Sequence, residues 1–233
     1  MQKKSVFNSK YVICDKTSFD MYYSDITQNE ITTISLNDNK SDIYTNYINY
    51  DIKNTEINFH HCNNDITLTC FALTDFYVHN ILFAIATGLI LNIPLNEIIL
   101  NLNKNKTLPG RGSCKFVENK IILEDINPGL NTTSIKKCIS NIKKYSSNYI
   151  LIIGGDYGIT CEEINENKLL KYIKTLDEPC IIFTGCVGYN LYNNIKKPCY
   201  YFEELEEAIA YSLKLDYDLV QIIYRSEYNK KMK

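Results

Sequence analysis

The feature that most limits the fold is the alternation of short apolar runs with amphipathic stretches between residues 149 and 223. The run Ile150-Leu151-Ile152-Ile153 is apolar without interruption, as a strand that is buried on both faces requires. The stretch 162–176, between two such runs, has the apolar spacing of a helix. Strands joined in this way form a parallel sheet with right-handed crossovers. Residues 108–233 are therefore predicted to form a Rossmann-like domain with a mainly parallel sheet.

The expected elements of this half can be given by residue range. A hairpin over 114–117 and 120–123 opens the domain, with its turn at Glu118-Asn119. Further strands are expected at 149–153, 180–183, 199–201 and 219–223. Helices are expected at 133–145, 162–176, 187–195 and 203–215.

The first half, residues 1–107, has a different pattern. Short strand-like runs come first, and the alternation of apolar and polar residues in 66–70 is that of a half-exposed strand, which predicts a hairpin over 57–73. Apolar residues then follow a helical period over 79–92 and 96–102. Strands followed by a buried helix pair indicate a sheet covered by helices, so the chain is predicted to be a two-domain α/β protein. Other strands are expected at 11–14 and 31–36.

Composition excludes several classes of function. The 25 basic and 27 acidic side chains are balanced, which argues against a nucleic-acid partner. Nine cysteines without a C-x-x-C pair indicate free thiols in a reducing compartment. The N-terminus lacks the apolar run of a signal peptide, and the apolar window 81–93 is shorter than the roughly 20 residues that span a bilayer. We therefore expect a cytoplasmic protein without a membrane partner.

A metal site could be suspected at His60-His61-Cys62, because imidazole and thiolate bind zinc. Adjacent strand residues point to opposite faces, however, and no H-x-x-x-H or C-x-x-C partner is present. We interpret this tripeptide as an ordinary strand end and predict no metal ligand.

His79 and Asn80 are the first candidate ligand-binding residues. They are polar residues at the predicted start of an apolar helix, where free backbone N–H groups attract an anion or an acceptor edge. The alternative is that Asn80 is only an N-cap, a role that Asn favours.

Two glycine-rich turns follow predicted strands, at 154–158 and 184–188. In a parallel sheet, ligands bind beyond the carboxyl ends of the strands. Neither turn matches G-x-G-x-x-G, so a nicotinamide oxidoreductase is disfavoured, and no G-x-x-x-x-G-K-[ST] phosphate loop is present. The glycines could also serve only to turn the chain sharply.

The strongest candidate site is the junction of the two halves. Arg111 stands between two glycines after Pro109, and Glu124-Asp125 ends a strand just before the turn at Asn127. The guanidinium fork of arginine suits phosphate, and a carboxylate at the end of a strand suits a ribose hydroxyl. The bland alternative is a linker followed by a turn.

The order of these pieces resembles the Mur ligase superfamily, whose members have an "HN" motif opening an Ala-rich helix, then "lPGR", then "D-Y-A-H-N-P". The matching segments here are His79-Asn80, Leu108–Gly112 and Ile121–Pro128. Within that superfamily, Glu124–Lys137 and Gly154–Ile164 resemble the synthetases of methanogenic archaea that make coenzyme F-430, a nickel tetrapyrrole. The resemblance covers residues 70–233 well and the first seventy loosely.

This resemblance implies an ATP-dependent ligase. In the family, a central ATPase domain and a Rossmann-like C-terminal domain close on ATP and Mg²⁺, and a substrate carboxylate is activated as an acyl phosphate. Residues 1–107 would be the C-terminal half of the central domain, and residues 108–233 the C-terminal domain. The reaction implied is the last ring closure of coenzyme F-430.

The resemblance also assigns candidate roles to residues that match its motifs. Asn80, beside His79, would contact adenine, and Arg111 would contact the phosphates. Glu124 or Asp125 would bind the ribose, an assignment that the shortened turn leaves open, and the adjacent Asn127 belongs to the same nucleotide-binding set. No catalytic residue is assigned.

This sequence also departs from the family pattern. Phe83 replaces the second Asn of "HNxxN", and Ile126 replaces the His before Asn-Pro. Since no phosphate-binding loop is present, the γ-phosphate lysine and the Mg²⁺ hydroxyl would come from a separate P-loop-containing chain or domain. A half-domain with an exposed sheet edge would favour such a partner. The alternative is a non-catalytic module that binds a nucleotide or a tetrapyrrole.

Overall fold

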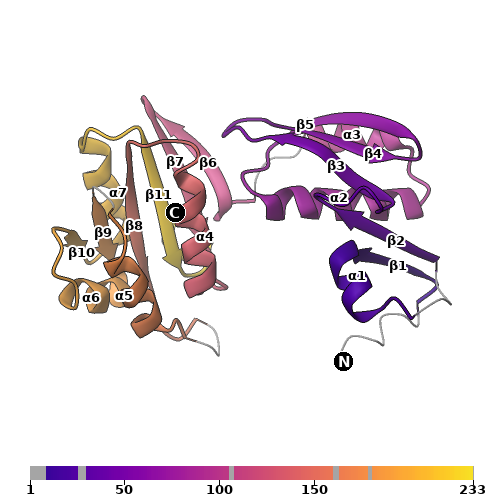
Figure 1. Ribbon diagram of the computed structural model, residues 1–233. Coiled ribbons are helices and arrows are strands. Elements are labelled where there is room, and N and C mark those ends of the chain that lie inside the picture. The colour runs from indigo at the N-terminus through magenta and orange to yellow at the C-terminus, as the bar shows by residue number, and fades with distance from the viewer. Residues whose placement is uncertain (1–8, 26–29, 105–107, 160–162, 178–179, 233) are drawn as a thin grey trace. The chain divides into compact units, whose positions relative to one another are not determined.

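The computed structural model describes residues 9–25, 30–104, 108–159, 163–177 and 180–232 (Figure 1). The chain separates into two compact units, Met1–Lys106 and Thr107–Lys233, called here unit 1 and unit 2. Each unit has its own β-sheet and its own hydrophobic core. The predicted two-part α/β architecture is confirmed, and the functional identities of the two halves remain predictions.

Unit 1 contains a five-stranded sheet in the order β1-β2-β3-β4-β5. The first three strands run parallel, and β4 and β5 continue the sheet antiparallel. The elements of this unit are β1 (Tyr11–Asp15), α1 (Lys16–Tyr22), β2 (Glu30–Ser35), β3 (Ile43–Asn49), β4 (Thr55–His61), β5 (Asn64–Cys70), α2 (Asp75–Ile90) and α3 (Leu95–Asn103).

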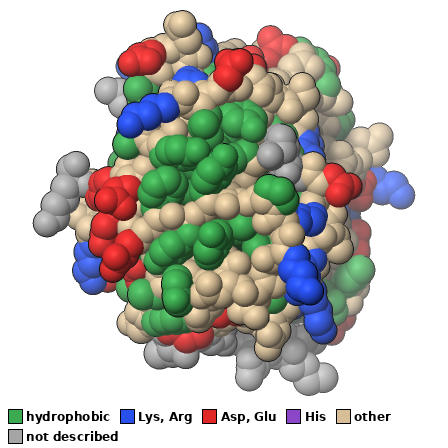
Figure 2. Space-filling model, turned by 90° about the vertical axis from the view of Figure 1, so that its left-hand side faces the viewer, with side chains coloured by type: hydrophobic (Ala, Val, Ile, Leu, Met, Phe, Trp, Pro, Cys, Tyr) green, Lys and Arg blue, Asp and Glu red, His purple; other side chains and the backbone are tan. Residues whose placement is uncertain are grey.

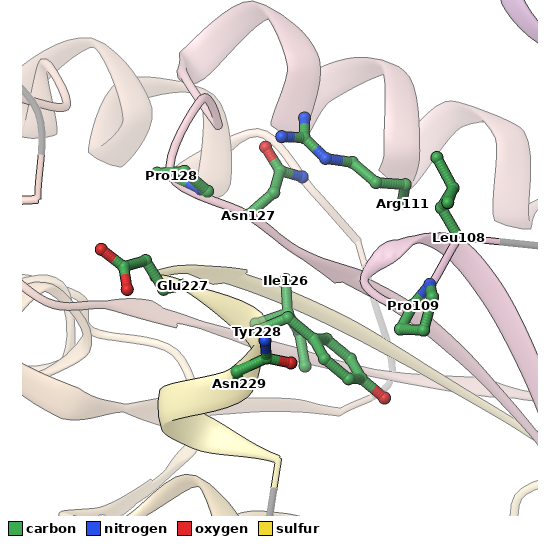
Figure 3. A pocket seen from close by; sticks show the side chains of 9 residues that line it. All are labelled: Leu108, Pro109, Arg111, Ile126, Asn127, Pro128, Glu227, Tyr228 and Asn229. Atoms are coloured by element: carbon green, nitrogen blue, oxygen red, sulfur yellow. The ribbon is translucent and has the colours of Figure 1, made fainter.

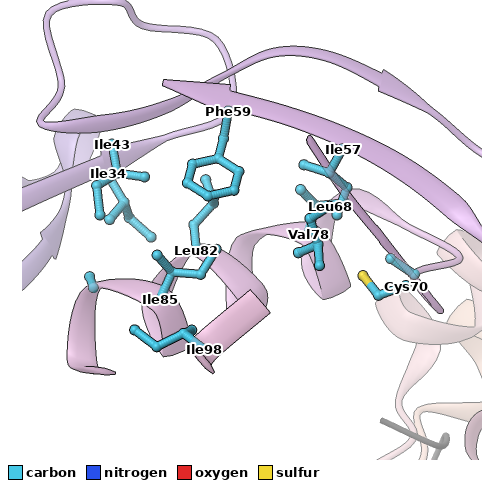
Figure 4. Packing of buried hydrophobic residues seen from close by; sticks show 12 residues of the cluster. Ile34, Ile43, Ile57, Phe59, Leu68, Cys70, Val78, Leu82, Ile85 and Ile98 are labelled. Carbon is cyan, nitrogen blue, oxygen red and sulfur yellow. The ribbon is translucent and has the colours of Figure 1, made fainter. Parts of the chain in front are cut away.

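The core of unit 1 forms between the sheet and helices α2 and α3 (Figure 4). Phe59 of β4 and Leu68 of β5 are fully buried against Leu82 and Ile85, which lie on one side of α2. Burying such a side chain stabilises the unit by about 1.5–3 kcal/mol. Ile98 attaches α3 to the same core, where a Cβ on Gly88 would lie only 2.6 Å from the Ile98 Cδ1 atom.

The predicted hairpin over residues 57–73 is confirmed as β4 and β5. Its two turn residues are Cys62 and Asn63, with φ of 47° and 63°. Two consecutive positive φ values give the turn the twist that a two-residue hairpin requires, and Asn accepts this conformation better than most residues.

The prediction that His79 and Asn80 start a helix is wrong. Helix α2 begins four residues earlier, at Asp75, with Thr74 as its N-cap. Asp75 and Phe76 at the start of the helix are exposed, so they lie outside the buried apolar stretch on which the prediction was based. His79 and Asn80 therefore lie in the second turn, and Asn80 is not the N-cap.

Unit 2 contains a six-stranded sheet in the order β10-β9-β8-β11-β7-β6. All neighbours pair in parallel except β6, which forms the predicted hairpin with β7. The elements are β6 (Arg111–Val117), β7 (Lys120–Ile126), α4 (Thr132–Ile142), β8 (Tyr149–Gly155), α5 (Glu166–Lys174), β9 (Ile181–Thr184), α6 (Gly185–Asn193), β10 (Tyr200–Phe202), α7 (Leu205–Lys214), β11 (Leu219–Arg225) and α8 (Tyr228–Lys231).

The sheet of unit 2 is covered on both faces, as its apolar strands require. Every residue of β8, β9 and β11 is buried. On one face, Ile152 and Ile222 share a core with Leu205 of α7. On the other face lies α4, whose Cys138 is hydrogen-bonded to Asp125. The carboxyl ends of the parallel strands therefore form one edge, where ligands of such sheets bind.

Candidate functional site

Arg111, the first residue of β6, stands between Gly110 and Gly112. Residues 110–112 are called here the arch. Both glycines have left-handed backbones, with φ of 70° and 68°. The pairing of β6 with β7 shifts between Arg111 and Ser113, so Gly112 is the extra residue of a β-bulge. A bulge re-aims the neighbouring side chain, and here it leaves Arg111 exposed.

Gly110 is required by its surroundings as well as by its conformation. A Cβ at this position would lie 2.4 Å from the Ile126 carbonyl oxygen and 2.5 Å from Tyr228 Cδ2. The Gly110 N–H donates to the Ser113 Oγ at 2.9 Å, and its carbonyl accepts from the Ile126 N–H at 2.9 Å. The arch is thus fixed against the end of β7 and against helix α8.

Arg111 lines a pocket of about 450 Å³ that lies wholly within unit 2 (Figure 3). Figure 3 shows the guanidinium beside the Asn127 amide, with Tyr228 and Asn229 on the other side of the end of β7. Arg111 and Asn127 supply polar donors to the pocket. Its apolar surface comes from Leu108, Pro109, Ile126 and Pro128. Its full lining is Leu108, Pro109, Arg111, Ile126, Asn127, Pro128, Glu227, Tyr228 and Asn229.

Asn127 joins the arch to the turn that follows β7. Its side-chain oxygen accepts from the Gly129 N–H at 3.2 Å, and its amide nitrogen lies 3.5 Å from the Gly110 carbonyl oxygen. Its own backbone N–H donates to the Tyr224 carbonyl at 3.2 Å. Because these bonds fix the turn, Asn127 positions the pocket wall beside Arg111.

Glu124 is fully buried and is held by three groups of the protein. Its Oε2 accepts from the Ser113 Oγ at 2.9 Å and from the Tyr228 hydroxyl at 3.1 Å, and its Oε1 lies 2.7 Å from the Lys115 Nζ. Burial lowers the pKa of Lys115, but Glu124 and Tyr228 outweigh this effect, and the net change is upward. The structure therefore places the buried carboxylate of Glu124 in an ion pair with the half-exposed Lys115, and Tyr228 of α8 donates to the same carboxylate.

Asp125 points to the opposite face of β7, toward α4, and pairs in register with Arg111. Burial raises the pKa of this carboxyl. Hydrogen bonds from Cys138, Gln221 and the Gly112 N–H, together with the charge of Arg111, oppose that rise only in part. The Gln221 amide donates to Asp125 at 3.1 Å. Of the two predicted acids, Asp125 is the one that interacts with Arg111.

The remaining predicted site residues, His79 and Asn80, lie in unit 1. The His79 Nε2 is 3.0 Å from the Asp15 Oδ2, which ties α2 to the N-cap of α1. Burial raises the pKa of Asp15, but hydrogen bonds from the Ser18 N–H and from His79 bring it below its ordinary value. Asn80 is exposed. The structure brings Arg111, Asp125 and Asn127 together within unit 2, and these two residues belong to a separate body.

The glycine turns after β8 and β9 have structural reasons. A Cβ on Gly154 would lie 2.0 Å from the Thr184 carbonyl oxygen, and a Cβ on Gly185 would lie 2.4 Å from the Tyr224 hydroxyl. Gly185 also has a left-handed φ of 68°. The Tyr224 hydroxyl donates to the Asp156 Oδ1 at 2.6 Å. Gly154 and Gly185 thus allow close approach of neighbouring segments, and the left-handed backbone of Gly185 also fits the alternative that the glycines turn the chain sharply.

Sequence reasoning missed the contribution of helix α8 to the pocket. Glu227, Tyr228 and Asn229 line it, although they are more than a hundred residues from Arg111 along the chain. Tyr228 also accepts from the Lys115 Nζ at 3.0 Å. The helix has only four residues, which is too short to show a helical period of apolar residues in the sequence.

The described residues also bear on metal binding and on membrane spanning. Among them, no three His, Cys, Asp or Glu side chains are close enough to hold a metal ion. His60 instead pairs with Asp65 at 2.7 Å, and His61 contacts Cys62. In the same part of the chain, no helix has the length and apolarity to span a membrane.

Comparison with solved structures identifies the class of fold. The chain is similar to MurF from Acinetobacter baumannii, with a TM-score of 0.72 and 14% identity, over 95% of this chain and 50% of that chain. It is also similar to MurF ligase from Thermotoga maritima in complex with ADP, with a TM-score of 0.66 and 14% identity, over 92% and 50% of the two chains. Folylpolyglutamate synthase from Thermotoga maritima gives 0.65 and 16%, over 84% and 46%. The chain therefore has the fold of about half of a Mur-type ligase.

Sequence comparison narrows this class. Residues 114–227 match the family described as "Coenzyme F430 synthetase CfbE, C-terminal domain". The chain is also 37% identical, over 118 residues, to the coenzyme F(430) synthetase of Methanocaldococcus jannaschii, covering 50% of this chain and 28% of that protein. This chain therefore has a Mur-ligase-like fold, and its residues 114–227 are similar to the C-terminal domain of coenzyme F430 synthetase.

Proposed function

We propose that this chain forms the C-terminal part of an ATP-dependent ligase that activates a substrate carboxylate as an acyl phosphate. The substrate that we propose is a nickel tetrapyrrole, and the reaction is the final ring closure of coenzyme F430. The observation that carries the proposal is the match of residues 114–227 to the synthetase domain, next to a pocket that presents an arginine.

The chemistry of the pocket supports a phosphorylated ligand. Arg111 is exposed at the mouth of the pocket, where its guanidinium can donate two parallel hydrogen bonds to phosphate oxygens. The hydrogen bonds of Gly110 fix the backbone beside this arginine, so the backbone need not be ordered on binding. The residues that are present therefore fit the nucleotide phosphates that ATP would bring to this site.

We assign the ribose contact to Asp125. Glu124 has its carboxylate occupied by Lys115, Ser113 and Tyr228 and has no exposed surface. Asp125 also accepts hydrogen bonds from Cys138, Gln221 and the Gly112 N–H, but it is partly exposed and pairs in register with Arg111. A carboxylate beside a phosphate-binding arginine can accept a hydrogen bond from a ribose hydroxyl. Asn127 supports both residues by fixing the turn.

The adenine contact that we propose lies in unit 1. Asn80 is exposed on α2, and its amide could pair with the base edge. His79, which is held by Asp15, would position that part of the helix.

We further propose that a P-loop-containing chain or domain completes the site from outside these residues. Strand β1 ends the sheet of unit 1, and no further strand pairs with it among the described residues. Helix α1 beside it has no buried residue, and Met21 and Tyr22 are 67% and 64% exposed. An open parallel edge beside exposed apolar side chains suits an interface. That partner would supply the groups that hold Mg²⁺.

The test is reconstitution. Purified chain is mixed with a P-loop-containing Mur-like protein, ATP, Mg²⁺ and the nickel tetrapyrrole acid, and both phosphate release and the ring-closed product are measured. We expect product only when both proteins are present. If the chain alone gives turnover, the proposal that the active site is shared between this chain and a P-loop protein is wrong. The same holds if no P-loop protein gives turnover when it is mixed with the chain. If calorimetry shows ligand binding but no P-loop protein ever restores turnover, the chain is a binding module.

A further inference from the structure

Glu124 does not line the pocket beside Arg111, yet its carboxylate is connected to two parts of the pocket wall. The residue lies in β7 and is fully buried. A buried carboxylate costs free energy unless it is hydrogen-bonded and paired with a cation. The groups that satisfy the carboxylate of Glu124 therefore show which parts of the structure it holds in place.

The β-bulge at Gly112 determines which residue of β6 lies opposite Glu124. Arg111 pairs with Asp125, and the next pair is Ser113 with Glu124, because Gly112 is the extra residue. In a regular strand residues 111 and 113 would lie on the same face, whereas adjacent residues of β7 lie on opposite faces. The bulge therefore allows Ser113 to reach Glu124 while Arg111 stays beside Asp125.

Through Ser113, Glu124 is connected to the arch. The Gly110 N–H donates to the Ser113 Oγ at 2.9 Å, and the Ser113 hydroxyl donates to the Glu124 Oε2 at 2.9 Å. A serine hydroxyl has one proton to donate and can accept at the same time, so both bonds of Ser113 are satisfied in this direction. Because the acceptor at the end is a carboxylate, the bond that it receives is stronger than one between neutral groups.

Through Tyr228, the same carboxylate is connected to helix α8. The Tyr228 hydroxyl donates to the Glu124 Oε2 at 3.1 Å and accepts from the Lys115 Nζ at 3.0 Å. The Lys115 Nζ lies 2.7 Å from the Glu124 Oε1, so the three side chains form a closed set of interactions. Helix α8 has four residues, and a helix of this length depends on such contacts for its stability.

We propose, on the basis of the function proposed above, that Glu124 is a positioning residue of the phosphate site. It holds the arch that carries Arg111 through Ser113, and it holds the α8 wall of the pocket through Tyr228. Glu124 then sets the affinity for the nucleotide phosphates without contacting them. The two adjacent acids of β7 have separate roles, since Asp125 faces the ligand and Glu124 aligns the groups that bind it.

The first test measures hydrogen exchange in the full chain by mass spectrometry, without nucleotide or partner. Tyr228→Phe removes a hydroxyl of α8 and keeps the ring. We expect exchange about 3–10-fold faster in α8 and also in the peptide that contains residues 108–113, because the carboxylate links the two segments. Glu124→Gln, which keeps the volume and removes the charge, should have the same two effects. Faster exchange in α8 alone would overturn the proposal.

Tyr200→Phe is the matched control for this measurement. It removes a tyrosine hydroxyl that is hydrogen-bonded to Tyr211. Tyr200 lies on β10, at the opposite edge of the sheet from β6. Figure 2 shows the β10 side of unit 2, where hydrophobic side chains form two bands at the surface. Exchange in residues 108–113 should be the same in Tyr200→Phe as in the wild type.

The second test measures the binding of a fluorescent ATP analogue to the chain mixed with its P-loop protein. Ser113→Ala should weaken binding by about 3–10-fold. It should have no further effect when Arg111→Ala is already present, because Ser113 acts through the arginine. Ser212→Ala is the control and should bind as the wild type does, since it removes a buried hydroxyl of α7 that donates to the Ile209 carbonyl at 2.7 Å.

The outcomes of this second test separate the two proposals. An Arg111→Ala variant that binds the analogue as the wild type does would refute the proposed function. A loss with Arg111→Ala but none with Ser113→Ala would refute the positioning role alone. Equal losses from Ser113→Ala with and without Arg111 would also refute it, because they would show a general loss of structure.

Discussion

Gly110 and Gly158 allow a direct test of how tightly the arch around Arg111 is built. Both glycines have left-handed backbones, with φ of 70° and 71°. A Cβ on Gly158 would have no neighbour within 4 Å, whereas a Cβ on Gly110 would meet the end of β7 and helix α8. The two glycine-to-alanine variants therefore share the backbone strain and differ in the steric contact.

The expected cost follows from these two terms. An L-residue in the left-handed region costs about 1–2 kcal/mol, so Gly158→Ala should lower the free energy of unfolding by about this amount. Gly110→Ala adds the contacts of 2.4 Å and 2.5 Å, and an overpacked site costs about 1–3 kcal/mol more. Gly110→Ala should therefore destabilise unit 2 by about 2–5 kcal/mol.

The assay is urea denaturation followed by far-ultraviolet circular dichroism, with the same slope required for both variants. A fluorescent nucleotide analogue added to the complete ligase should also bind less well to Gly110→Ala, because the arch presents Arg111. If the two variants lose equal stability, the close packing of the arch against Ile126 and Tyr228 is not real and this reasoning is refuted.

Two other predictions concern unit 1 and the thiols. Asp15→Asn keeps an N-cap but removes the charged contact with His79. Because the pKa of Asp15 is lowered by folding, the stability that it contributes should be complete above its unfolded value of about 3.8 and should disappear as the pH falls through its folded value. Urea titrations of wild type and variant at several pH values check this, and a difference that grows toward acid would contradict it. Cys62 and Cys186 are exposed and should react with a maleimide in the native protein, as read by peptide mass spectrometry. Cys138 is only partly exposed and burial raises its pKa, so that thiol should react much more slowly than Cys62 and Cys186, and labelling as fast as theirs would contradict this prediction.

The sequence predicted best the elements with a regular apolar pattern. The strand at Ile150–Ile153 was found because its apolar run is uninterrupted, and the helix around Ile139 was found because its apolar residues follow a period of 3.6. Strand β3 was missed because Tyr44, Thr45 and Asn46 are mostly polar and a bulge follows Thr45. Such a strand is held by its neighbours and has little signal of its own.

The candidate site was predictable only in part. Arg111 was found because an arginine between two glycines is unusual in a linker, and because its guanidinium suits phosphate. The choice between Glu124 and Asp125 depended on which face of β7 each occupies, and that depends on pairing with β6. The contribution of Tyr228 required the tertiary structure, because contacts between distant segments leave no local pattern.

Arg111 is proposed to bind the phosphates of the nucleotide in a ligase completed by a P-loop protein. The decisive measurement is the rate of ATP-dependent product formation by that pair of proteins with Arg111→Ala, with Arg111→Lys and with Lys214→Ala. The last is a control for the loss of one exposed positive charge at the end of α7. We predict a loss of about 10²–10³-fold for Arg111→Ala, partial activity for Arg111→Lys, and a wild-type rate for Lys214→Ala. An Arg111→Ala variant as active as Lys214→Ala would contradict the account.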